Sequence, residues 1–552
     1  MNDTDPMDSF ILEGLDAVQQ RAVEASSRYI LIVAPPGSGK TRVLSARFAR
    51  LVKEGVNPDA LLAVTFTNRA AKEMKERITA LTGLSRRILD ISTFHGFSLQ
   101  LLKKTRPPFS LYGRYDTLRL LKELGVKSPS ASARMVSAVK NGTIQAAGED
   151  AEVCSAYAGA LKRDNALDLD DLIPEAIKEL EAGAAGGGLK SHIMVDEYQD
   201  INPLQARLVR LLAGGPASVV AIGDPDQAIY SFRGSSLKSF LEFQAEYPGA
   251  QIINLSRNYR SAGKIVFASG KLIENNLERL KKDSSPVRTG GEILYAECAD
   301  ERAESEFIIK EIERMMGGLT SQTAGDSELN FSNFAVLLRT NRQVETLAES
   351  FSRSSIPYYK TGEDGKSFGD FILHLKGRRP VGDVTLTDFI KEEGRLLGLK
   401  EDLVETFVRS ASDYRERTAV EVLDEYFEEA ALTEPEDRLD IKSDRVSLLT
   451  LHMAKGLEFK VVFIAGFEDG VVPYVKGGET SIEEERRLFY VGMTRARDTL
   501  YLVSAQRRRL WGEALESAPS RFLKELPDKL IDRVSIEKKR VKRRPVQKGL
   551  FD

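Results

Sequence analysis

Residues 29–42 read YILIVAPPGSGKTR, and this stretch decides the fold of the chain around it. Its first five residues, 29–33, are apolar or aromatic and predict a short buried strand. A turn of small and rigid residues follows, and a helix with an apolar face then begins at Lys40. Strand, glycine-containing loop and helix in this order are typical of a phosphate-binding loop.

The residue types in the loop indicate what it binds. Gly37 and Gly39 allow backbone N–H groups to approach phosphate oxygens, and the helix N-terminus adds partial positive charge. We expect Lys40 to reach the β- and γ-phosphates of a nucleotide, and the Thr41 hydroxyl to hold Mg²⁺. Ala34 stands where the general pattern has its first glycine, so the match is partial.

Composition sets the outer limits. The chain has 552 residues, of which 42% are hydrophobic and 29% charged, so we expect several soluble domains. We find no apolar run long enough to predict a membrane span, and the first ten residues do not resemble a secretory signal. Cys154 and Cys298 have no metal-ligand spacing, and their scarcity favours a reducing, cytoplasmic location. The net charge of −3 neither favours nor excludes a nucleic-acid partner.

Several other apolar stretches run into polar motifs, as expected for parallel strands that carry ligands at their carboxyl ends. Residues 60–66 lead into TNRAAKEM, and a short strand predicted at 88–91 leads into STFHGF. Upstream of the loop, Asp16 is a candidate N-cap of a helix. The helical pattern between residues 98 and 165 predicts an insertion, whose basic residues favour a solvated face over phosphate contacts.

Two further strands end in candidate catalytic groups. Residues 191–195 lead into Asp196 and Glu197. In a phosphate-loop protein we expect Asp196 to hold Mg²⁺ and Glu197 to accept a proton from the attacking water. Residues 218–222 lead into GDPDQAIYSFRG, which supplies Gln227 as a candidate for contacting the γ-phosphate.

Aromatic residues beside these motifs suggest a second ligand. Tyr230 and Phe232 are candidates for stacking on nucleic-acid bases, which contributes about 1–3 kcal/mol per base. Packing in the protein core is the competing interpretation for each ring. His95 is equally compatible with a purely structural role.

Taken in order, the motifs resemble those of UvrD/Rep/PcrA-type superfamily 1A DNA helicases. The matching stretches are APPGSGKT, TFTNRAA, TFHGF, VDEYQD, GDPDQAIYSFRG and LSRNYRS, followed by LLTLHMAKGLEF and EEERRLFYVGMTRAR. The resemblance implies an α/β fold with two RecA-like P-loop motor domains, parallel sheets flanked by helices, and two helical insertions. The second insertion is reduced, which puts unwinding without a partner in doubt while leaving ATP hydrolysis and translocation intact.

The resemblance also implies domain boundaries. The first motor domain would comprise residues 1–97 and 165–254, with its helical insertion at 98–164. The second would comprise 255–370 and 445–525, with its reduced insertion at 371–444. A tail would follow at 526–552.

Position by position, the resemblance assigns roles to individual residues, with ATP and Mg²⁺ as cofactors. Gln19 would read the adenine, Tyr259 and Arg42 would flank its ring, and Glu458 would bind the ribose. Arg260 and Arg495 would be arginine fingers from the second motor domain. The implied nucleotide-binding set is Gln19, Gly37, Ser38, Gly39, Lys40, Thr41, Arg42, Tyr259 and Glu458. The implied catalytic set is Glu197, Gln227, Arg260 and Arg495, with Thr41 and Asp196 at the metal. The implied DNA path is Phe66, Asn68, His95, Tyr230, Phe232, Arg233 and His452.

The end of the chain carries two more signals. Residues 538–544, KKRVKRR, form a basic run that is equally compatible with phosphate binding and with a plain disordered tail. The last six residues are similar to Q-x-x-L-F peptides that dock on bacterial sliding clamps. Gln547, Leu550 and Phe551 are therefore candidate clamp-binding residues.

The sequence thus predicts an ATP-driven motor on single-stranded DNA and on junctions of single- and double-stranded DNA. The resemblance implies 3′-to-5′ movement, a nucleoid-associated location, and work in DNA repair, recombination or replication restart. One alternative is a motor subunit that unwinds only with a partner. Another is a DNA-binding switch that uses ATP to change shape, against which the complete hydrolytic set argues.

Overall fold

The computed structural model describes residues 10–183, 190–317, 329–360, 365–380, 382–414, 417–434, 437, 443–475, 481–510 and 513–535. Contacts divide the chain into two compact units. The first contains Met1–Val266, Asn276–Arg288 and Lys360–Ser443, and the second contains Phe267–Asn275, Thr289–Tyr359 and Asp444–Asp552. This division differs from the domain boundaries expected from sequence, because residues 255–266 and the second helical insertion make their contacts within the first unit.

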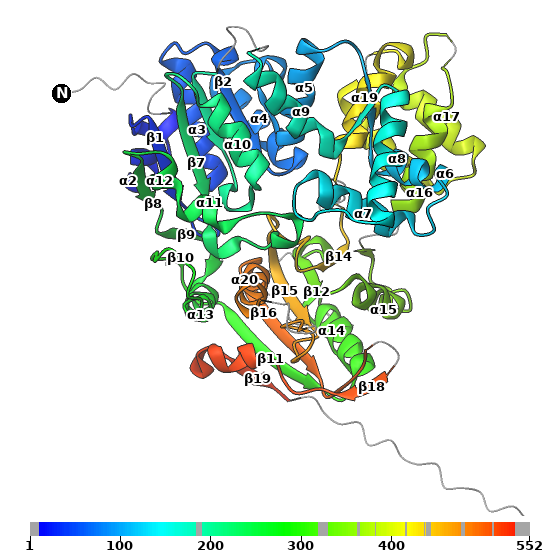
Figure 1. The fold of residues 1–552 in the computed structure, drawn as a ribbon. Coiled ribbons are helices and arrows are strands. Elements are labelled where there is room, and N and C mark those ends of the chain that lie inside the picture. The colour runs from blue at the N-terminus through cyan, green and yellow to red at the C-terminus, as the bar shows by residue number, and fades with distance from the viewer. Residues whose placement is uncertain are drawn as a thin grey trace, which may run out of the picture. The chain divides into compact units, whose positions relative to one another are not determined.

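A six-stranded parallel sheet forms the centre of the first unit (Figure 1). Its strand order is β3-β2-β6-β7-β1-β8, so β1 lies between β7 and β8. The loops that follow these strands therefore leave from the same, carboxyl edge of the sheet. The strands are β1 (Tyr29–Val33), β2 (Leu61–Thr65), β3 (Ile91–Thr93), β6 (His192–Val195), β7 (Ser218–Gly223) and β8 (Gln251–Asn254).

Helices cover both faces of this sheet, which explains why its central strands are continuously apolar. On β1, Ile30 and Ile32 join one buried cluster, and Leu31 and Val33 join the other, because side chains of a strand alternate between faces. The first face is covered by α2 (Ala17–Glu24), α3 (Lys40–Lys53) and α4 (Asn68–Thr82). The second is covered by α5 (Phe94–Thr105), α9 (Leu169–Glu181), α10 (Pro203–Leu212), α11 (Leu237–Leu241) and α12 (Phe243–Glu246).

One predicted strand is wrong in its position. The structure has a 3₁₀ turn, η2 (Arg86–Ile88), where the strand over 88–91 was expected, and β3 begins only at Ile91. The Ser85 hydroxyl accepts a hydrogen bond from the N–H of Arg87 and so caps this turn. A local side-chain bond therefore outweighs the apolar pattern there.

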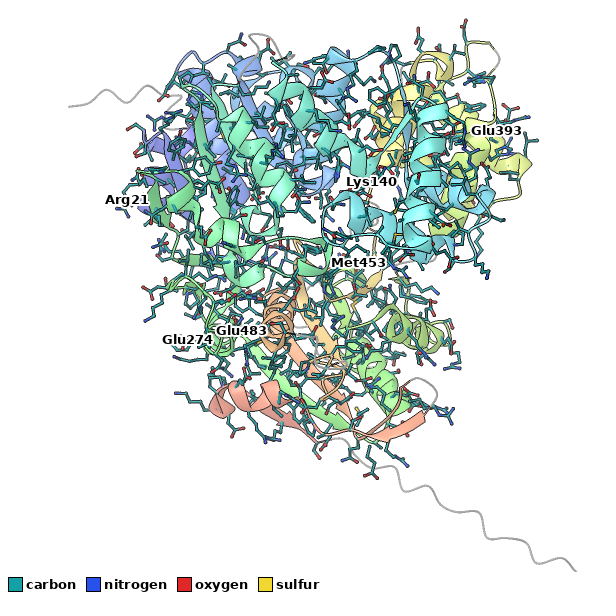
Figure 2. All side chains as sticks on the ribbon, in the orientation of Figure 1. Arg21, Lys140, Glu274, Glu393, Met453 and Glu483 are labelled. Carbon is teal, nitrogen blue, oxygen red and sulfur yellow. The ribbon has the colours of Figure 1, made fainter. Side chains whose placement is uncertain are left out.

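A small helical bundle lies within residues 98–164, where the first insertion was expected, although α5 (Phe94–Thr105) packs on the sheet. The bundle contains α6 (Arg114–Glu123), α7 (Pro129–Lys140) and α8 (Glu149–Arg163), and β4 (Ser110–Tyr112) pairs with β5 (Ala166–Asp168) at its base. Lys140, labelled in Figure 2, lies 2.7 Å from Asp168 and 2.9 Å from Asp171. This half-buried ion cluster joins α7 to the start of α9.

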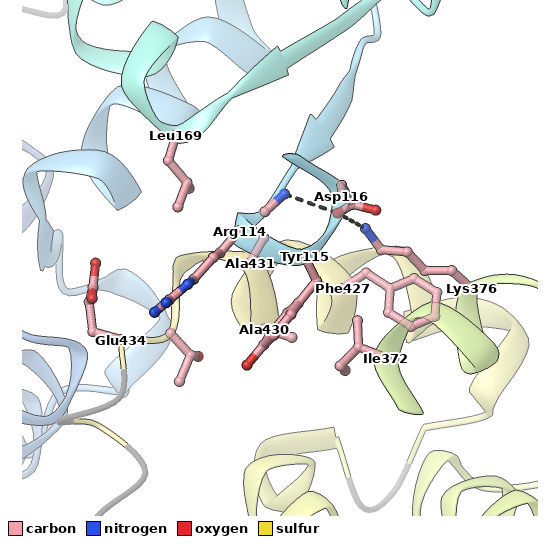
Figure 3. Close-up of a pocket in the computed structure, with 12 residues that line it drawn as sticks. Arg114, Tyr115, Asp116, Leu169, Ile372, Lys376, Phe427, Ala430, Ala431 and Glu434 are labelled. Carbon is pink, nitrogen blue, oxygen red and sulfur yellow. Dashed lines mark hydrogen bonds and ion pairs between the residues drawn. The ribbon is translucent and has the colours of Figure 1, made fainter. Parts of the chain in front are cut away.

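The second insertion, of four helices, packs against the first. Its helices are α16 (Gly365–Lys376), α17 (Leu386–Leu396), α18 (Glu401–Ser410) and α19 (Ala419–Leu432). Lys376 Nζ lies 2.6 Å from Asp116 Oδ2, and Phe427 lines the same small pocket (Figure 3). Gly369 lies so close to Tyr115 that a Cβ would collide with the aromatic ring. The two insertions therefore form a closely packed interface within the first unit.

The second unit contains a seven-stranded sheet with the order β13-β14-β12-β15-β16-β11-β19. The strands are β11 (Glu292–Cys298), β12 (Phe334–Leu338), β13 (Tyr358–Lys360), β14 (Val446–Thr450), β15 (Phe459–Ala465), β16 (Ala496–Ala505) and β19 (Asp532–Val534). The flanking helices are α14 (Glu301–Met315), α15 (Asn341–Phe351) and α20 (Ile482–Met493). The pairs from β14 through β19 are parallel, which confirms the predicted class of two parallel α/β sheets flanked by helices.

Five further elements lie outside the two large sheets and the helices described so far. Strand β9 (Arg257–Ala262) pairs with β10 (Ser285–Arg288), and α13 (Gly263–Ile273) follows β9 directly. A hairpin, β17 (Arg507–Leu510) and β18 (Glu513–Glu516), follows β16. Among the described residues, no helix is long and apolar enough to cross a membrane.

Candidate nucleotide and DNA site

The loop between β1 and α3 has the backbone that phosphate binding requires. Gly37 and Gly39 have φ values of +70° and +83°, in the left-handed region that glycine adopts without strain. Ser38 Oγ donates to the carbonyl of Pro35 at 2.7 Å and tightens the turn. Helix α3 starts at Lys40 without a side-chain cap, as expected where a ligand phosphate meets the helix N-terminus.

Residues predicted to hold the adenine gather beside this loop. Gln19 Nε2 donates to the carbonyl of Ser38 at 2.8 Å, and its Oε1 accepts from the N–H of Asp16 at 2.9 Å. The Tyr259 hydroxyl donates to Asp16 Oδ2 at 2.5 Å. Arg42 donates to a backbone carbonyl just before α2. The capping box of Asp16 and Gln19 at the start of α2 is therefore bonded to Ser38 and to Tyr259.

The LSRNYRS motif packs against the other side of the loop. Asn258, which is 2% exposed, donates through Nδ2 to the carbonyl of Pro36 at 2.9 Å. A Cβ added to Gly37 would lie 2.6 Å from Arg260 Cβ and 2.8 Å from Asn258 Oδ1. Arg260, expected in the second motor domain, thus lies beside the phosphate loop in the first unit, and its role as an arginine finger stays a prediction.

The predicted catalytic carboxylates follow β6. The N–H of Glu197 donates to Asp196 Oδ1 at 2.9 Å. Glu197 has a φ of +50°, a conformation that costs a non-glycine residue on the order of 1 kcal/mol or more and is found at functional sites. Its Oε2 accepts a hydrogen bond from Gln199 Nε2 at 2.6 Å. The candidate base is therefore held in place by a neighbouring side chain.

Gln199 is a site residue that the sequence analysis did not single out. It is fully buried, and its Oε1 accepts from the N–H of Asp224 at 2.9 Å. Asp224 in turn accepts from Gln227 Nε2 at 2.8 Å. A continuous chain of hydrogen bonds thus joins Glu197 to Gln227. The position of Gln199 inside VDEYQD, two residues after the predicted base, was the available signal.

We expect replacement of Gln199 by leucine to lower the maximal rate of ATP hydrolysis by about 10- to 100-fold, because a base misplaced by ~1 Å loses on this order of activity. Nucleotide affinity should change little, since no contact of Gln199 reaches the phosphate loop in the described structure. Steady-state hydrolysis and binding of a fluorescent ADP would measure the two effects. Gln244→Leu, at an exposed position of α12, is the matched control.

The structure distinguishes the two candidate stacking aromatics. Tyr230 is 3% exposed, and its ring stacks on Phe66 with centroids 4.9 Å apart. This position agrees with packing in the protein core, the competing interpretation for this ring. Phe232 is 67% exposed. The Arg233 guanidinium lies 5.3 Å from the Tyr230 centroid and 6.0 Å from the Phe232 centroid. Phe232 is therefore the more exposed of the two rings, as stacking on a base requires.

We expect Phe232→Ala to weaken binding of an oligo(dT) strand by roughly 5- to 100-fold, because a stacked base is lost at a cost of about 1–3 kcal/mol. Fluorescence anisotropy at fixed ionic strength would measure this change. The matched control is Phe267→Ala, a ring on α13 with a similar exposed fraction of 61%. Equal losses in both variants would contradict a specific role for Phe232.

Other predicted DNA contacts lie near the acidic end of the second insertion. Asn68 Nδ2 donates to the carbonyl of Leu432 at 2.8 Å and to Asp437 Oδ2 at 3.2 Å. Arg233 lies 4.0 Å from Glu434. Burial lowers the pKa of His95 below its usual value, which favours the neutral ring. Leu432, Glu434 and Asp437 thus share polar contacts with residues of the predicted DNA path.

The remaining candidates belong to the second unit. Arg495 is 1% exposed and donates through Nε to the carbonyl of Val491 at 2.9 Å and through Nη1 to that of Leu457 at 3.2 Å. Glu458 lies 3.4 Å from Arg497. The predicted roles of Arg495, Glu458 and His452 toward nucleotide and DNA remain predictions.

The residues present fit a Mg²⁺-nucleotide. Thr41 offers a hydroxyl at the first turn of α3, and Asp196 offers a carboxylate at the end of β6. Mg²⁺ takes few protein ligands when substrate phosphates and water supply the others, and oxygen donors suit it. Among the described residues, no three or more His, Cys, Asp or Glu side chains form a group that could hold a metal ion.

A phosphate loop and a carboxylate pair at one edge of a parallel sheet, in a chain with two such sheets, define a two-domain P-loop protein of the RecA-like class. Family models agree with this class: the UvrD/REP helicase N-terminal domain matches residues 15–248, and the UvrD-like helicase C-terminal domain matches 253–368 and 384–507. The chain belongs to the UvrD/Rep helicase family.

Curated relatives cover nearly the whole chain. The ATP-dependent DNA helicase PcrA of Staphylococcus aureus is 31% identical over 654 aligned positions, which include 96% of this chain and 88% of the relative. The ATP-dependent DNA helicase UvrD1 of Mycobacterium tuberculosis is 32% identical over 671 positions, with 95% and 86% covered. Both alignments are longer than the chain itself, because the relatives carry segments that this chain lacks.

Proposed function

We propose that this protein is an ATP-dependent DNA helicase that moves 3′ to 5′ along single-stranded DNA, in DNA repair, recombination or replication restart. The observation that carries the proposal is the segment 223–234. It places Gln227 of the nucleotide site and the exposed Phe232 close together in the chain, at the edge of the sheet that carries the phosphate loop. A shift of Gln227 on hydrolysis can therefore reach a base-stacking ring. The names of the relatives support the same activity.

Each step rests on a named group of the chain. The N–H groups of residues 37–41 bind the phosphates, and Lys40 neutralises their charge. Glu197, oriented by Gln199, accepts the proton of the attacking water. Mg²⁺ held by Thr41 and Asp196 would stabilise the charge that develops on the phosphate oxygens. Gln227 contacts the γ-phosphate and moves the segment that ends in Phe232.

The decisive experiment compares ATP hydrolysis with and without single-stranded DNA, followed by strand displacement on duplexes with 3′ or 5′ tails. We expect strong stimulation by DNA and displacement of the 3′-tailed substrate alone. Displacement of the 5′-tailed substrate would reverse the proposed direction. ATP hydrolysis that is indifferent to DNA would contradict a DNA-coupled motor.

A motor subunit that unwinds only with a partner is the second candidate, favoured by the short second insertion. Its four described helices pack on the first insertion, and the relatives carry additional residues. DNA-stimulated hydrolysis without strand displacement, and recovery of displacement with a copurifying protein, would select this candidate.

The C-terminal residues Gln547, Leu550 and Phe551 lie outside the described residues. We propose, from their sequence, that they dock on a sliding clamp. Pull-down of purified bacterial clamp by the full chain should be lost in the Leu550→Ala/Phe551→Ala variant. Equal retention of both forms would reject this contact.

A further inference from the structure

A cluster of buried charges lies under the start of the segment 223–234 and is unexplained by the site described above. We propose that Arg279 and Lys282 are positioning residues that clamp this segment, and that the clamp couples Gln227 to the base-stacking Phe232. The inference rests on the proposed function and concerns how its two binding sites communicate.

The clamp reaches the segment from a distant part of the sequence. Lys282 Nζ contacts Asp224 Oδ1 and lies 3.0 Å from Asp226 Oδ2. Arg279 Nη2 donates to the same Asp226 oxygen at 2.9 Å. Both carboxylates are fully buried, and the side chains of Lys282 and Arg279 are only 3% and 12% exposed. Residues 276–288 therefore contribute a charged contact to the core of the first unit.

Charge balance explains why both cations are needed. Two buried carboxylates separated by one residue would repel each other strongly, and each would carry a large desolvation cost without a partner. Arg279 and Lys282 are equal to them in number and opposite in charge. Burial and the positive charge of Lys40 lower the pKa of Lys282, and the contacts of its Nζ with two carboxylates favour the charged form against this shift.

Hydrogen bonds of Asp224 link the two cations to Gln227 of the nucleotide site. Asp224 Oδ1 accepts from the N–H of Asp226 at 3.0 Å and its Oδ2 accepts from Gln227 Nε2 at 2.8 Å. These bonds hold η4 (Pro225–Gln227), and η5 (Ser231–Arg233) begins after residues 228–230. Phe232 lies on η5. Asp224, which is held by Lys282, therefore fixes both the side-chain amide of Gln227 and the first residues of the segment 223–234.

The test uses the full chain with Lys282→Met, which keeps an unbranched side chain of nearly the same length and removes its charge. We expect the DNA-stimulated rate of hydrolysis to fall about 10-fold or more and the DNA concentration for half-stimulation to rise, while affinity for a fluorescent ADP changes less than about threefold. Lys282→Arg should restore most of the stimulation. Lys281→Met, at the exposed neighbouring lysine, should behave as the parent protein does.

A double variant tests whether the ion pair is responsible. Asp226→Asn removes one buried negative charge, so combining it with Lys282→Met should cost less than the sum of the single effects. A merely structural role predicts a reduced fraction of nucleotide-binding protein with an unchanged rate per active site, and that result would reject the clamp. Normal stimulation in Lys282→Met would reject it too. Absence of DNA stimulation in the parent protein would instead refute the proposed function itself.

Discussion

Replacement of Glu197 by glutamine is expected to lower the rate of ATP hydrolysis by about 100- to 10,000-fold, which is the usual contribution of a positioned general base. Glutamine keeps the size and one hydrogen-bonding oxygen of glutamate, so the bond from Gln199 Nε2 can persist. The amide cannot accept the proton of the attacking water. The loss should therefore appear in the maximal rate, with nucleotide affinity nearly unchanged.

Two controls make this result specific. Glu181→Gln, at an exposed position of α9, carries the same chemical change away from the site and should retain full activity. Binding of a fluorescent ADP to Glu197→Gln should match the parent protein. If hydrolysis fell less than about tenfold, the base would have to be another group, and the left-handed backbone of Glu197 would need another explanation.

Much of the first unit follows from local sequence patterns. Apolar runs such as 29–33 and 218–222 became central strands, because strands buried on both faces must be apolar throughout. Asp16 caps α2 as predicted, since its carboxylate accepts the N–H groups that the first turn leaves without partners. The phosphate loop is likewise a local structure, because its two glycines and the helix N-terminus are adjacent in sequence.

Groups that act through distant partners were not predictable in this way. Lys282 stands in the run ERLKKD, which reads as a solvated charged segment, yet its side chain is buried against Asp224. Asn258 contacts the phosphate loop because β8, which precedes it in the chain, pairs with β1. Tyr230 and Phe232 have the same chemistry and nearly the same position in sequence, and only tertiary packing separates the buried ring from the exposed one.

The second insertion shows the same limit on a larger scale. Residues 386–397 and 420–431 have the apolar spacing that is typical of amphipathic helices, and α17 and α19 lie there. Their attachment depends on single contacts between distant residues, such as Lys376 with Asp116 and Gly369 with Tyr115. Such pairs leave no periodic signal in one sequence, so the expected boundaries, with an insertion at 371–444 between two segments of the second motor domain, follow the order of segments in the chain. The contacts instead place this insertion in the first compact unit.

Replacement of Gly37 by alanine is expected to weaken nucleotide binding by about 30-fold or more, which corresponds to roughly 2 kcal/mol. The left-handed φ of +70° already disfavours any residue with a Cβ. The new methyl group would also lie 2.6 Å from Arg260 Cβ and 2.8 Å from Asn258 Oδ1, so the loop or the LSRNYRS motif must shift. Such a shift moves the backbone N–H groups that bind the phosphates.

Gly55 separates these two causes. It has a φ of +88°, and nothing lies within 4 Å of a Cβ added there, so Gly55→Ala has the backbone strain without the collision. We expect this variant to lose about 1 kcal/mol of stability and to bind nucleotide normally. Titration of fluorescent ADP, with thermal unfolding as a measure of stability, would compare the two variants. Equal affinities would show that the phosphate loop adapts to the added methyl group, and that the close approach of Asn258 and Arg260 does not set its shape.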